Sequence, residues 1–154
     1  MSRLETIARG IIVIGLVAGA ATAALVLGGR LLGGSDAPPS SDIGPLLGIA
    51  TVVHERVRDD LAPGDRDGRS VLLAVPEAPT PQAAVNGLLR LLRSAGWIVS
   101  SRGGAVSADG ELCIVLRTAQ AWLDDAANAG LRDEFEARVA ETREAAVVAD
   151  LFFC

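Results

Sequence analysis

The sequence predicts an α+β fold: a small domain of helices on an antiparallel sheet, with a β-α-β-β core and added helices, behind a single N-terminal transmembrane helix. Three observations support this class. A charge-free apolar run lies near the N-terminus, short β-branched runs alternate downstream with segments of helical spacing, and Pro and Gly residues separate them. We expect a cytoplasmic stub and transmembrane anchor at 1–34, a linker and juxtamembrane helix at 35–64, and a small soluble α+β domain at 65–154.

The predicted anchor covers about residues 7–32. Residues 10–29 carry no charge and lie between Arg9 and Arg30, and a helix of that length spans a hydrocarbon core of about 30 Å. Two Arg precede the helix and one follows it. The positive-inside rule therefore predicts a single-pass protein of the cell membrane, a signal-anchor topology with its N-terminus in the cytoplasm and its C-terminal domain outside.

Small residues within the apolar run leave two questions open. Residues 18–20 and 21–23 resemble signal-peptidase sites, but the apolar run continues to Leu32, which favours a retained anchor over a cleaved signal. Gly15 and Gly19 form a GxxxG pair that Ala23 extends by one turn. Such a ridge lets two helices approach closely, so these three residues are candidates for helix association.

The linker and the segment after it are predicted from composition and spacing. Residues 33–41 are rich in Gly, Ser and Pro, which suits a short spacer. Asp42 is a candidate N-cap, and apolar residues then recur every three or four positions as far as Leu61. This spacing predicts an amphipathic juxtamembrane helix that ends near residue 62 and packs on the domain.

The soluble domain begins, by this interpretation, with a buried strand at 70–75. Pro76 and Pro79 end it, Thr80 caps a helix, and Gly96 closes that helix. Downstream, Asp109-Gly110 marks a hairpin turn. The further elements expected are strands at 97–101 and 112–116 with a short piece at 105–107 between them, a helix at 118–129, and a last strand at 146–153. Residues 131–145 fit both templates, and we favour a helix as far as about residue 140.

Composition and charge exclude some classes of partner. All 14 basic residues are Arg, which is typical of a GC-rich bacterial genome and cautions against interpreting each Arg as an anion ligand. Residues 35–154 carry eleven Arg against eighteen acidic residues, a net charge of −7. An acidic domain repels polyphosphates, so no nucleic-acid partner is expected.

The two cysteines, Cys113 and Cys154, lie in or beside predicted strands, where neighbouring strands would bring them within bonding range. Outside the cytoplasm this pair would form a disulfide; the alternative is two buried thiols. With one histidine and two distant cysteines the chain offers no spacing for a metal site, and no cofactor motif occurs. Acidic pairs such as Asp124-Asp125 and the group Asp133, Glu134 and Glu136 fall on predicted polar helix faces, so no catalytic residue is predicted.

The sequence therefore predicts a membrane-anchored extracytoplasmic domain that acts in protein–protein interaction within the cell envelope, more as a binding domain than as an enzyme. Its expected partners are the lipid bilayer, through the anchor, and another membrane or envelope protein or a second copy of itself. Two alternatives remain: a structural subunit of a membrane complex assembled through the GxxxG helix, and an enzyme with an unrecognised acidic site.

Overall fold

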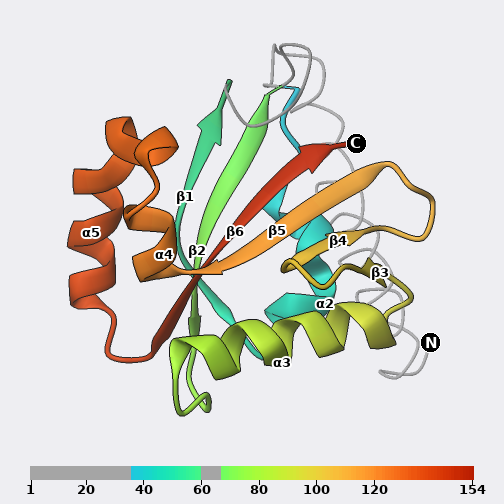
Figure 1. Cartoon of the computed structure of the whole chain (residues 1–154), viewed down its shortest axis with the longest axis horizontal. Helices are drawn as coiled ribbons and strands as arrows, with labels where there is room; N and C mark the ends of the chain where they lie inside the picture. Colours follow the sequence, from blue (N-terminus) through green and yellow to red (C-terminus); the bar gives the residue numbers. More distant parts are fainter. Residues whose placement is uncertain (1–35, 60–66) are drawn as a thin grey trace, which may run out of the picture. The chain divides into compact units, whose positions relative to one another are not determined.

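The computed structural model describes residues 36–59 and 67–154, and these form one antiparallel sheet with helices on both faces (Figure 1). The strand order is β1-β2-β6-β5-β4-β3, and every neighbouring pair is antiparallel. The α+β class is thereby confirmed. In chain order the elements are η1 (Ser40–Ile43), α2 (Gly44–Leu47), β1 (Thr51–Arg58), β2 (Gly68–Val75), α3 (Pro81–Ser94), β3 (Ile98–Val99), β4 (Gly104–Val106), β5 (Leu112–Thr118), α4 (Ala119–Leu123), η2 (Ala126–Leu131), α5 (Arg132–Glu141) and β6 (Ala145–Phe153).

Each face of the sheet has its own apolar core. On the first face α2 and α3 pack on the odd-numbered residues of β2 and β6, with Leu46, Leu88 and Leu92 fully buried. On the second face α4 and α5 pack on the even-numbered residues, and Trp122 stacks on Phe135 with their ring centroids 4.4 Å apart. Both faces of β2 and β6 are covered, which explains why these strands are continuous apolar runs rather than alternating ones.

The helix predicted after Thr80 is confirmed as α3. The Thr80 hydroxyl accepts a hydrogen bond from the Ala83 amide at 3.1 Å, Pro81 occupies the first helical position, and Gly96 follows with φ +90°. These are the expected cap, N1 and C-terminal residues of a helix. The strands at 70–75, 112–116 and 146–153 are likewise present, each extended by one or two residues at one end.

The predicted juxtamembrane helix at 42–62 is wrong beyond Leu47. Gly48 ends α2, and residues 51–58 form β1, which pairs with β2 and makes the sheet begin before residue 65. A bulge at Val53 explains the misleading spacing: Val52 and Val57 are five positions apart, yet both lie on the first face of the sheet. The extra residue of a bulge breaks the two-residue alternation by which a strand is recognised.

The C-terminal half differs from expectation in further details. The strand expected at 97–101 is only β3, residues 98–99, and the short piece expected at 105–107 is β4, residues 104–106. The predicted helix at 118–129 is divided into α4 and η2, because Asp125 adopts an extended backbone and caps η2 by accepting the Ala127 amide at 3.0 Å. The ambiguous residues 131–145 contain α5, as favoured, and β6 begins at Ala145.

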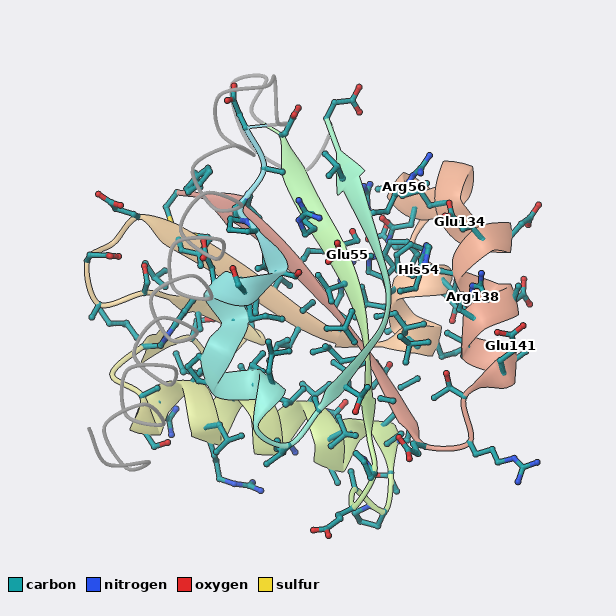
Figure 2. The ribbon with its side chains drawn as sticks, turned by 180° about the vertical axis from the view of Figure 1, so that it is seen from behind. His54, Glu55, Arg56, Glu134, Arg138 and Glu141 are labelled. Carbon is teal, nitrogen blue, oxygen red and sulfur yellow. A yellow bond between two sulfur atoms is a disulfide. The ribbon has the colours of Figure 1, made fainter. Side chains whose placement is uncertain are left out.

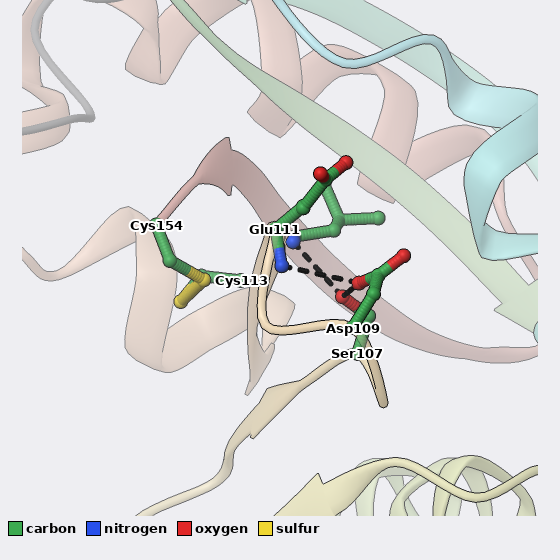
Figure 3. The surroundings of a disulfide bond; sticks show 6 residues. Ser107, Asp109, Glu111, Cys113 and Cys154 are labelled. Atoms are coloured by element: carbon green, nitrogen blue, oxygen red, sulfur yellow. Dashed lines mark hydrogen bonds between the residues drawn. A yellow bond between two sulfur atoms is a disulfide. The ribbon is translucent and has the colours of Figure 1, made fainter.

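A disulfide joins Cys113 on β5 to Cys154, just beyond β6, with the two Cα atoms 5.4 Å apart (Figure 3). The predicted pairing is confirmed. The bond lies near the β4–β5 turn, where Asp109 accepts hydrogen bonds from the Ser107 hydroxyl at 2.5 Å and the Glu111 amide at 3.1 Å. Both bonds lower the pKa of the Asp109 carboxyl, and the bond from Ser107 has the larger effect. Disulfide and turn together fix the end of β6 against β5.

The predicted anchor at about 7–32, with Gly15, Gly19 and Ala23, lies outside the described residues. Within the part of the chain that is described, no helix is long and apolar enough to cross a membrane.

Candidate protein-binding groove

An apolar groove of about 750 Å³ opens between three segments of the domain. Its walls are the turn from α2 into β1 (residues 47–51), the end of β2 with the loop that follows it (75–79), and the first turns of α3. The volume is within the range of pockets that hold a ligand, about 300 to 1,000 Å³.

Small and rigid residues create this groove. On α3 the wall consists of Ala83, Ala84 and Gly87, whose side chains are too short to fill the space. Opposite them, Pro76 and Pro79 restrict the backbone of the loop that leads into the helix. The short side chains on α3 therefore leave the space open, and the longer side chains of Glu77 and Arg90 lie along it.

Large apolar side chains stand exposed at its mouth. Leu47 is 41% and Ile49 46% exposed, and both line the groove. Of the five large hydrophobic side chains that are exposed in the described part of the chain, these two line the groove, whereas Val52, Val57 and Ile98 lie elsewhere. Single exposed hydrophobics are ordinary, but two at the mouth of a concave surface are typical of an interaction site.

The groove carries one charge of each sign. Glu77 and Arg90 line it, and neither forms an ion pair with another described residue. His54, Glu55 and Arg56 on β1 are instead paired within the domain. Figure 2 shows His54 on β1 next to Glu134 on α5, where the ring Nε2 lies 2.9 Å from the carboxylate, and Glu55 on the other side of the strand, where it accepts a bond from Arg69 at 3.1 Å. Glu77 and Arg90 are thus the charges available to a ligand in the groove.

A second polar feature, the network around Asp150, is largely buried, and among its hydrogen-bonding atoms only Arg117 Nε lacks a partner in the described part of the chain. Asp150 is 2% exposed and accepts hydrogen bonds from the Ser70 hydroxyl at 2.6 Å, from Arg117 at 2.5 Å and from the Trp122 indole at 3.1 Å. Arg117 also donates to Asp125 at 2.7 Å. Because every acceptor of Asp150 faces the protein's own donors, this network is suited to holding α4 on the sheet rather than to binding a substrate.

The pKa values of this network follow from the same contacts. Burial acts to lower the pKa of Arg117, but its bonds to Asp150 and Asp125 outweigh that effect and raise it. The pKa of Asp125 is lowered, first by the Ala127 amide and then by Arg117. Arg117 and Asp125 are therefore both held in their charged forms.

A smaller pocket of about 260 Å³ lies between the end of β1 and η2. Arg58 at its edge is 5% exposed and donates to Asn128 Oδ1 at 2.5 Å and to the Ala127 carbonyl at 3.3 Å, while its guanidinium lies 5.7 Å from the centroid of the Trp122 ring. Asn128 in turn donates to the Trp122 carbonyl at 2.8 Å. Arg58 is accordingly part of the packing of η2.

The acidic residues considered for catalysis do not converge. Asp124 accepts a bond from Gln120, Asp125 caps η2, and Asp133 lies in the first turn of α5. None of them lines either pocket. Among the described residues no group of three His, Cys, Asp or Glu side chains is arranged to hold a metal ion.

The chain matches no family model, and it is similar to no curated protein and to no solved structure. The apolar spacing of the sequence assigns Ile49 to the packed face of a helix and does not single out Leu47. Sequence reasoning missed the Asp150 network, although a Ser and an Asp inside otherwise apolar strands were a signal that a buried donor faces them.

Proposed function

We propose that this chain is a membrane-anchored, non-enzymatic binding domain that acts in protein–protein interaction outside the cytoplasm, with the groove as its contact surface. The observation that carries the proposal is the groove itself, with Leu47 and Ile49 exposed at its mouth. The scattered acidic residues favour binding over catalysis. The disulfide supports the outer location, because such bonds persist in oxidising compartments.

The position of the groove suits a tethered domain. The carbonyl of Pro38 accepts a bond from Arg69 at the start of β2 at 2.8 Å, whereas Val75 at the end of β2 lines the groove. The chain thus enters the domain at one end of the strands and the groove opens at the other, about 24 Å away for eight residues of strand.

The ligand class follows from the lining. An apolar segment of another envelope protein would bury the side chains of Leu47 and Ile49, and one basic and one acidic group on that segment would match Glu77 and Arg90. The two charge pairs would orient the bound segment, while burial of the apolar surface would supply the affinity.

A pull-down from membranes with quantitative mass spectrometry tests the proposal, using the full tagged chain and two matched variants. Ile49→Asp places a carboxylate at the groove, and Ile98→Asp does the same at an exposed isoleucine on β3. We expect one envelope protein to be recovered with wild type and with Ile98→Asp, and recovery to fall about tenfold or more with Ile49→Asp, since an unpaired buried carboxylate opposes binding. Equal recovery with all three chains would contradict the assignment.

A further inference from the structure

The second face of the sheet is covered over only part of its width. The helix α5 packs on β1 and α4 packs on β5 and β6, and Figure 1 shows both helices away from β3 and β4. The buried cluster beneath these helices contains no residue of β3 or β4. What remains is a patch that we call the bare face. It consists of Ile98, Val106, Cys113, Val115 and Phe152.

The register of the strands places these five residues together. Ile98 pairs with Val106, Val106 with Cys113, and Cys113 with Phe152, so that one row crosses four strands. Directly paired residues point to the same face of a sheet. Val115 is two positions from Cys113 on β5 and therefore lies on the same face. Ile98 is 69% exposed and the other four side chains are half-buried.

We propose that the bare face is the contact between the domains of two copies of this chain that are anchored in the same membrane. The patch contains no charged side chain, whereas the domain carries a net charge of −7 over residues 35–154. Two acidic domains repel one another over most of their surfaces. An uncharged apolar patch is where two copies meet without opposing like charges, and a two-fold axis brings the same patch on each copy together.

The geometry of the tether also favours this surface. Phe152 pairs with Gly68, which is next to Arg69, so the bare face lies at the end of the strands where Pro38 is bound. Two sheets stacked face to face about an axis parallel to their strands keep both tether ends on one side. Two chains rooted in one bilayer can pair in this way.

The edge strands of the sheet are β1 and β3. Strand β3 has only two residues, and a very short edge strand resists pairing with another chain. The edge of β1 does not suit two tethered copies either. Antiparallel pairing of two β1 edges would direct the two chain entries to opposite ends of the combined sheet. The bulge at Val53 and the charged Glu55 and Arg56 are also devices that protect an edge from pairing. The bare face is therefore the surface compatible with both charge and tether.

Five side chains make a small contact compared with the 20 to 30 residues a side of a standard interface. Its strength rests on the proposed anchor, because confinement of two domains to one membrane supplies an effective concentration of the order of millimolar. We expect pairing in the membrane and dissociation when the protein is diluted in detergent.

Photo-crosslinking in intact membranes tests the pairing with two full-length chains that carry different tags. The first chain has p-benzoylphenylalanine in place of Ile98, and the second is wild type, Ile98→Asp or Ile49→Asp. We expect a crosslink between the two tags with wild type and with Ile49→Asp, and a yield at least about tenfold lower with Ile98→Asp, since the new carboxylate would lose its water in the contact. The photoreactive residue at Ile49 should give no crosslink between the two tags.

Several results would overturn the pairing, and they differ from those that would overturn the groove. A yield unchanged by Ile98→Asp, or one lost only when Gly15→Ile and Gly19→Ile are introduced, would place the contact outside the bare face. If alkaline carbonate extracted the chain from membranes, the proposed transmembrane anchor would be wrong, and the proposed pairing would be wrong with it. Recovery of the envelope partner with Ile49→Asp does not depend on either crosslink, so the pull-down tests the groove separately from the pairing.

Discussion

Trp122 on α4 donates its indole N–H to the carboxylate of Asp150 on β6, at 3.1 Å to one oxygen and 3.2 Å to the other. The two residues are 28 positions apart, and both are almost completely buried. This bond connects the helical layer of the second face to the centre of the sheet. It also places the Trp122 ring against Phe135, so that α4 and α5 are both held by one buried carboxylate.

We predict that Asp150→Ala lowers the free energy of unfolding by about 3 to 5 kcal/mol. The change leaves the cation of Arg117 and the donors of Ser70 and Trp122 without their shared acceptor, and loss of one partner of a buried ion pair has this magnitude. Urea unfolding followed by tryptophan fluorescence measures the effect. Asp124→Ala, at an exposed carboxylate, is the control and should change stability by less than about 0.5 kcal/mol. Equal effects of the two changes would contradict this assignment.

Acid should destabilise the domain in part through Asp125. Its folded-state pKa is lowered, first by the Ala127 amide and then by Arg117, so the stabilisation it contributes is complete above the ordinary value of about 3.9 and is lost as pH falls through the folded pKa. Asp125→Asn keeps an acceptor oxygen but does not titrate. We predict that this variant loses less stability than wild type in urea titrations between about pH 5 and pH 2. Identical curves for this variant and the wild type would refute the prediction.

How much of this fold was readable from sequence depended on where the determining contacts lie. The helix α3 was predictable to within a residue because Thr80, Pro81 and Gly96 act locally. Strand β1 was not, because Val53 forms a bulge whose position depends on pairing with β2, a contact distant in sequence. The division of α4 from η2 at Asp125 is intermediate. Asp is a common N-cap residue, but the cap at this position also depends on a hydrogen bond to Asp125 from Arg117 on β5.

The candidate sites were less predictable than the fold for the same reason. The groove combines residues 47–51, 75–79 and α3, and only the pairing of β1 with β2 and the packing of α2 on α3 bring these segments together. The disulfide was the exception, since two cysteines allow one intramolecular pairing and both lay in or beside predicted strands.

Removal of the disulfide should destabilise the domain by about 3 to 4 kcal/mol, because it closes a loop between cysteines 41 positions apart. The double variant Cys113→Ser with Cys154→Ser and the wild-type chain under reducing conditions should unfold at the same, lower urea concentration. The double variant should not respond to reductant, which makes it the matched control. A reduced wild type as stable as the oxidised protein would show that β6 is held without the bond.

The two glycines that flank β3 should respond differently to alanine. Both have positive φ, +90° at Gly96 and +82° at Gly103, which costs an alanine about 1 to 2 kcal/mol at either position. Only at Gly103 would the new Cβ also meet a neighbour, the Leu116 carbonyl oxygen at 2.9 Å, and that carbonyl belongs to the backbone of β5. Gly103 also accepts a hydrogen bond from the Leu116 amide at 2.9 Å, so relief of the contact would disturb this bond. We therefore predict that Gly103→Ala costs about 1 to 3 kcal/mol more than Gly96→Ala in urea unfolding. Equal costs would mean that β4 and β5 separate easily at this point, which would also weaken the bare face that both strands form.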